Sequence, residues 1–77
     1  MPRFYFHIRQ GDLFEHDIEG VELPSAEEAR REAEDSAREM VAEAVLRSEV
    51  IDGRLFEVTS EDGSVVATVP FASVIRL

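Results

Sequence analysis

The side chains best suited to chemistry lie near the start of this 77-residue chain, where Tyr5 and Arg9 flank His7 at alternate positions. Apolar and polar residues alternate from Arg3 to Arg9, which predicts a strand that carries these three side chains on one face. Histidine titrates near neutral pH and can serve as an acid or a base, but no residue in the sequence is a recognisable nucleophile for it. We therefore predict no catalytic residue. We interpret Tyr5, His7 and Arg9 either as a face that binds a protein partner or an anion, or as a solvated strand face.

A second group has the residue types of a metal site: Asp12, Glu15, His16, Asp17 and Glu19. Acidic residues at alternate positions before Gly20 match the first half of an EF-hand calcium loop, but Ala26 stands where that loop needs a bidentate glutamate. His16 with Asp17 or Glu19 would give two ligands of a zinc-type site, and no third is evident. An acidic edge strand and turn that resist pairing with other chains are the simpler interpretation. We expect no metal and no cofactor.

One long amphipathic helix from Ser25 to Arg47 is predicted to position the rest of the chain. Ser25 followed by Glu28 has the pattern of a capping box. The apolar residues fall at helical spacing on one stripe: Ala26, Ala29, Ala33, Ala37, Met40, Val41, Ala44 and Val45. The alanines let the helix approach a sheet closely. Larger side chains, ending with Val45 and Leu46, are expected to widen that contact toward the end of the helix.

Two hairpins flank the helix, with turn signals at Gly11, at Asp52-Gly53 and at Asp62-Gly63. The predicted strands are Arg3–Arg9, Leu13–Asp17, Arg54–Ser60 and Val65–Val69. We predict a single α+β domain over residues 1–77, arranged β-β-α-β-β, with a four-stranded antiparallel sheet and the helix packed on one face. Since the first and last strands are the most apolar, we expect them in the centre. The order is then Leu13–Asp17, Arg3–Arg9, Val65–Val69, Arg54–Ser60.

The composition narrows the classes of function. The net charge is −9, which opposes contact with nucleic acid or anionic lipid. Binding of nucleic acid through Arg3, Arg9 and Arg54 beside aromatic rings is therefore an unfavoured alternative. There is no cysteine, so the redox compartment is not constrained. No apolar run reaches membrane-spanning length and no signal-peptide pattern is present, so we expect a cytoplasmic protein.

Four stretches together resemble a known family: residues 1–7 (MPRFYFH), 17–24 (DIEGVELP), 29–33 (AR-EA) and 69–71 (VPF). The chain is similar along nearly its whole length to a family of short, uncharacterised alphaproteobacterial proteins that has a domain-of-unknown-function label. Ser25 stands where that family more often has aspartate, and both residues cap helices. The resemblance implies a stand-alone bacterial domain, and it implies no reaction, ligand or catalytic residue.

Our leading hypothesis is a non-enzymatic interaction or regulatory module that binds a protein partner or, as a homodimer, a second copy of itself. Tyr5, His7, Leu55 and an apolar tail offer more apolar surface than a monomer needs, and the tail is expected either to fold back on the core or to anchor a partner. The tail residues are Phe71, Val74, Ile75 and Leu77. The alternative is a domain that binds a small ligand or a divalent metal through His7 or through the cluster of Glu15, His16, Asp17 and Glu19.

Overall fold

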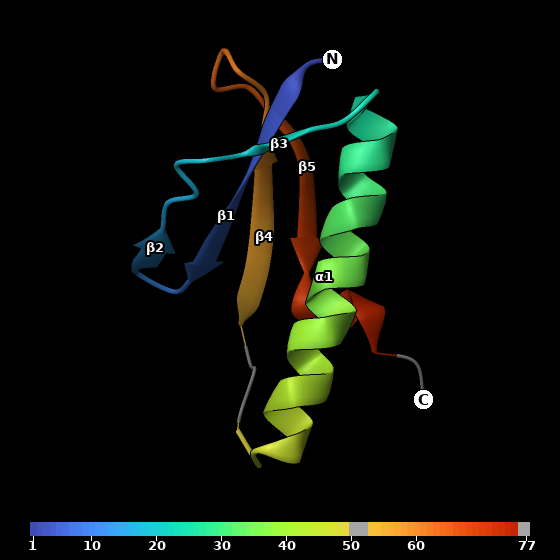
Figure 1. Ribbon diagram of the computed structural model, residues 1–77. Coiled ribbons are helices and arrows are strands. Elements are labelled where there is room, and N and C mark those ends of the chain that lie inside the picture. Colours follow the sequence, from blue (N-terminus) through green and yellow to red (C-terminus); the bar gives the residue numbers. More distant parts are fainter. Residues whose placement is uncertain (50–52, 76–77) are drawn as a thin grey trace.

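A computed structural model describes residues 1–49 and 53–75, and it has the predicted α+β architecture (Figure 1). The elements in chain order are β1 (Arg3–Gln10), β2 (Leu13–Glu15), β3 (Val21–Glu22), α1 (Ala26–Leu46), β4 (Arg54–Thr59), β5 (Val65–Pro70) and the 3₁₀ helix η1 (Phe71–Val74). The β-β-α-β-β order is confirmed, with the two-residue strand β3 added before the helix. Asp52 of the predicted turn and Leu77 of the tail lie outside the described residues.

All strand pairs in the sheet are antiparallel, and the order is β2-β1-β4-β5. β3 also pairs with β1, opposite Arg3 and Phe4, on the same side as β2. The helix lies over one face of the sheet, where it contacts mainly β5, β4 and η1 (Figure 1). The first strand is central, as predicted. The expected position of Val65–Val69 beside it is wrong, because β4 takes that place and β5 forms the edge.

Burial explains why β4 is central. Phe56 and Val58 of β4 point at the helix and are almost fully buried. This burial is favoured by a position between two strands, and β4 lies between β1 and β5. Val65 and Val66 at the start of β5 are instead 54% and 37% exposed. Pro70 at its end has no N–H to donate to a further strand, which suits an edge. The apolar content of β5 alone therefore gave the wrong order.

The start of the helix agrees with the prediction. Ser25 is the N-cap, and its side-chain oxygen accepts a hydrogen bond from the Glu28 N–H at 3.2 Å. Four alanines on one stripe are buried: Ala29, Ala33, Ala37 and Ala44. Their small side chains let the helix backbone lie close to the sheet. Among the described residues, no helix is long and apolar enough to cross a bilayer.

The expectation for the other end of the helix holds for Met40 and Val41, which pack against the core, and is wrong for Val45 and Leu46, which are 67% and 85% exposed. The 21 residues of α1 span about 32 Å at 1.5 Å per residue. The six residues of β4 or β5 span only about 20 Å. The helix therefore extends past the sheet, as Figure 1 shows, and its last turn has no strand beneath it.

The apolar tail folds back on its own chain. Phe71 is fully buried, Val74 is 9% exposed, and both belong to the same core cluster as the helix alanines. Ile75 remains 42% exposed. Two of the residues that suggested surplus apolar surface are thus part of the core.

The close contact at Ala33 gives a test of the packing. We expect Ala33→Leu to lower the free energy of unfolding by about 1–3 kcal/mol, because the added atoms must displace the sheet. Ala42 is exposed on the same helix, so Ala42→Leu is the matched control and should change little. Urea denaturation measures both, and equal effects of the two variants would contradict the packing described here.

Candidate functional site

His7 lies on the sheet face away from the helix, together with Tyr5 and Arg9, as the alternation predicts. It is, however, only 8% exposed. The rings of Phe14 and His16 cover it, with centroids 5.3 and 5.0 Å from the imidazole centroid. His7 is therefore a buried group beneath an aromatic cover rather than part of an open surface.

Both ring nitrogens of His7 have hydrogen-bond partners. The backbone N–H of Asp17 donates to Nδ1 at 3.1 Å, and Nε2 lies 3.1 Å from Oγ1 of Thr59. Because Nδ1 accepts, the proton of the neutral ring is on Nε2 and is donated to the threonine hydroxyl. The ring thus joins the segment after β2 to β4, and neither nitrogen is available to a metal or a substrate.

The carboxylate of Asp17 holds the same segment against β1. Its Oδ2 accepts from the Phe6 N–H at 3.0 Å, and its Oδ1 accepts from the N–H groups of Glu19 and Gly20, each at 3.2 Å. β2 pairs with the second half of β1 and β3 with its first two residues. Between these strands the carboxylate of Asp17 takes the place of the missing backbone acceptor for Phe6, so the chain can cross from β2 to β3 without an unsatisfied N–H.

The electrostatics agree with this geometry. Burial, and then the charge of nearby His16, lower the pKa of His7 below its ordinary value, although Asp17 and Glu57 act in the opposite direction. Burial alone would raise the pKa of Asp17, but the backbone N–H groups that donate to it outweigh burial and lower that pKa. The folded protein therefore favours neutral His7 beside ionised Asp17.

The expected partner face is consequently only partly accessible. Arg9 is exposed, but its Nε forms an ion pair with Glu57 at 3.1 Å and its guanidinium lies 4.5 Å from the centre of the Phe14 ring. Tyr5 is half-buried. Tyr5, His7 and Arg9 remain a prediction as a binding face, and Tyr5 and Arg9 are the members through which a partner would be reached.

The structure does not assemble the predicted acidic cluster. Asp17 is tied to backbone N–H groups, Glu15 faces the helix side of the sheet, and Glu19 is exposed. Within residues 1–49 and 53–75, no three His, Asp or Glu side chains come together as metal ligands. The metal-binding alternative thus receives no support from the geometry.

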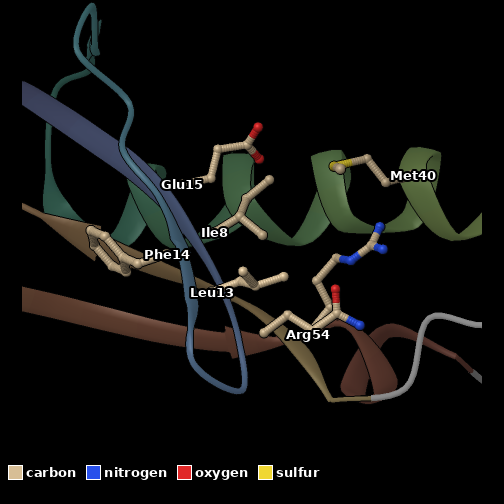
Figure 2. Close-up of a pocket in the computed structure, with 7 residues that line it drawn as sticks. Ile8, Leu13, Phe14, Glu15, Met40 and Arg54 are labelled. Carbon is tan, nitrogen blue, oxygen red and sulfur yellow. The ribbon is translucent and has the colours of Figure 1, made fainter.

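A groove on the helix side of the sheet was not predicted. It has a volume of about 420 Å³ and opens between the β1–β2 hairpin and the second half of α1. Ile8, Leu13 and Met40 give it apolar walls, and Glu15 and Arg54 add charges of opposite sign (Figure 2). The helix lies over β4 and β5, so the β1–β2 side stays uncovered. The residues come from four elements, and no local sequence pattern joins them.

Arg54 distinguishes this groove. Among the described arginines it is the one without an ion pair to a described carboxylate. Its guanidinium carbon lies 5.8 Å from the centre of the Phe71 ring, and Figure 2 shows the side chain extending toward the side of Met40. Arg3 is paired with Glu22, and Arg9 lies on the opposite face of the sheet. The three arginines considered for nucleic-acid binding therefore do not form one basic patch.

These features define a small α+β domain whose buried titratable groups serve the fold and which has an open apolar groove beside α1. The chain belongs to the family described as domain of unknown function DUF6894, whose model matches residues 3–72. The resemblance to a family of unknown function is thus confirmed. No curated protein and no solved structure gives a significant match.

The hydrogen bonds of His7 predict how stability depends on pH. Because the pKa of His7 is lowered on folding, the unfolded chain binds more protons below about pH 6.5, and the free energy of unfolding should fall as the pH drops from 7.5 to 5.5. In His7→Gln, the free energy of unfolding should depend much less on pH. In His16→Gln, it should still fall as the pH drops. Urea denaturation at both pH values measures it. Equal stability of the wild type at the two values would contradict the assignment of a neutral, bonded His7.

Gly20 gives a second test of the crossing from β2 to β3. A Cβ at this position would lie 2.9 Å from the Phe4 carbonyl oxygen and 2.9 Å from Cε1 of Tyr5. Gly11 has a similar positive φ, +59° against +70°, but has open space around it. Both alanine variants should lose about 1–2 kcal/mol to backbone strain, and Gly20→Ala should lose at least about 1 kcal/mol more from overlap. Equal losses in thermal or urea unfolding would show that the crossing is not tightly packed.

Proposed function

We propose that this domain is a non-enzymatic protein-interaction module, and that its contact surface is the groove with the end of the helix beside it. We call this surface the open end and define it by Ile8, Leu13, Met40, Leu46 and Arg54. The observation that carries the proposal is the groove itself, a hollow with apolar walls at the part of the sheet that the helix leaves uncovered.

Exposure supports the proposal. Leu13, which lines the groove, is 72% exposed, and Leu46 at the end of α1 is 85% exposed. Single exposed apolar residues are common on protein surfaces, but apolar side chains that gather around a hollow are typical of binding sites. The buried His7 and Asp17 are fully engaged in hydrogen bonds, so the groove is a better binding site than the histidine face.

The charges indicate the kind of partner. An aliphatic side chain would fill the groove against Met40 and Ile8, and a carboxylate next to it would pair with Arg54, which has no ion pair in the described part of the chain. A net charge of −9 attracts partners that are basic overall and speeds their association. We propose a bacterial cytoplasmic setting as part of the same hypothesis, which cell fractionation would test.

Site-specific cross-linking tests the proposed surface even though the partner has not been identified. A photoreactive amino acid is placed at Leu13, at Leu46 or, as the control, at exposed Ala26 on the first turn of the same helix, in cells that produce the protein naturally. We expect one shared adduct from positions 13 and 46 and none from position 26.

A substitution in the groove tests whether the cross-link depends on this surface. Leu13→Glu places a charge at the exposed wall of the groove and should remove the adduct formed at position 46 while leaving circular dichroism unchanged. Absence of an adduct at both groove positions, or an equal adduct at Ala26, would refute the proposed surface.

A further inference from the structure

The last two described elements form a surface without charge. Residues 63–75 contain no Asp, Glu, Lys or Arg, although 32% of the chain is charged. They include the whole of β5 and η1. Val65, Val66 and Ile75 are exposed to 54%, 37% and 42%. A run of this length without charge is unlike every other part of the sequence.

β5 is also an edge strand without a charged side chain, and its only edge-blocking residue is Pro70 at its end. Natural edge strands usually carry charges or are very short, because their free N–H and C=O groups can pair with another chain. The opposite edge follows that rule, since β2 has only three residues and ends with Glu15. β5 has six residues, most of them β-branched, and within the described part of the chain no strand pairs with its outer side.

The charge of the molecule indicates what covers this edge. Two copies that each carry −9 repel where their acidic surfaces approach, so the favourable place for contact is the surface free of charge. An antiparallel pairing of a strand with its own copy is compatible with a two-fold axis, the commonest symmetry of homodimers. The strand geometry is regular from Ala67 to Pro70, after a bulge near Val58 and Thr59, so the axis would pass near Thr68.

The size of the molecule is consistent with this contact. Its accessible surface is 5261 Å², whereas a compact monomer of 8.7 kDa has about 4700 Å². Its radius of gyration of 12.4 Å also exceeds the value of about 11.5 Å expected for this length.

From these observations we infer that the outer side of β5 pairs with β5 of a second copy across a two-fold axis near Thr68, so that the two sheets join into one. This surface is separate from the open end, which stays free in the dimer. The inference therefore does not depend on the proposed partner groove.

Light scattering after size-exclusion chromatography, from micromolar to millimolar protein, tests the inference. We expect the wild type to be a dimer, and we expect Thr68→Glu to raise the dissociation constant at least tenfold, because two like charges would face each other at the axis. Thr68→Val should keep the dimer. Leu46→Glu, at the open end, should keep it too. Circular dichroism checks that every variant is folded.

An engineered disulfide tests the register of the proposed β5–β5 pairing. The chain has no cysteine, so Thr68→Cys would place the only thiols of the dimer opposite each other, within the Cα separation that a disulfide accepts. It should oxidise to a covalent dimer much faster than Ala42→Cys. A wild type that is monomeric at millimolar concentration, or a dimer that Leu46→Glu breaks and Thr68→Glu does not, would overturn the inference while leaving the groove proposal intact.

Discussion

The whole architecture depends on one contact, the close approach of an alanine-faced helix to a sheet that is shorter than the helix. The stripe of Ala29, Ala33 and Ala37 lets α1 lie low over the sheet, where Val58 and Phe71 fill the space below. Small side chains give close packing but a narrow contact, so the helix covers little more than β4, β5 and η1. Because α1 also extends past the strands, both the groove and the exposed helix end follow from this single geometry.

The other side of the sheet is closed in a different way. There Asp17 and His7 connect the crossing from β2 to β3 with β1 and β4 through hydrogen bonds instead of apolar packing. His7 has the residue type best suited to chemistry, but it is used as a structural link, with its proton position fixed by a backbone donor. A chain of this size has few residues with which to cover the second face of the sheet by apolar packing. On that face the hydrogen bonds of His7 and Asp17 hold the chain in place instead.

The local parts of the fold were predictable from the sequence because their causes are local. The Ser25 cap, the helix and the hairpin between Arg9 and Phe14 each depend on residues a few positions apart. The strand order was not predictable in this way, since it depends on whether β4 or β5 lies between two neighbouring strands. Val65 and Val66 look like core residues in the sequence, and only the position of the helix shows that they are not.

The candidate site illustrates the same limit. Tyr5, His7 and Arg9 were correctly placed on one face, but the cover over His7 comes from Phe14 and His16, whose position depends on strand pairing. The groove joins side chains from β1, β2, α1 and β4, so no sequence window contains it. One signal was present: a stripe that runs to Val45 is longer than any six-residue strand can cover, which predicts an uncovered helix end.

The central claim is that Leu13 and Leu46, the exposed apolar side chains of the open end, are not used by the fold. The most direct measurement is the free energy of unfolding of the double variant Leu13→Ser, Leu46→Ser, at protein concentrations too low for association. Since both side chains are largely exposed, we expect a value within about 0.5 kcal/mol of the wild type. A loss of about 2 kcal/mol or more would mean that these leucines belong to the core, and the open end would then be a part of the fold and not a binding surface.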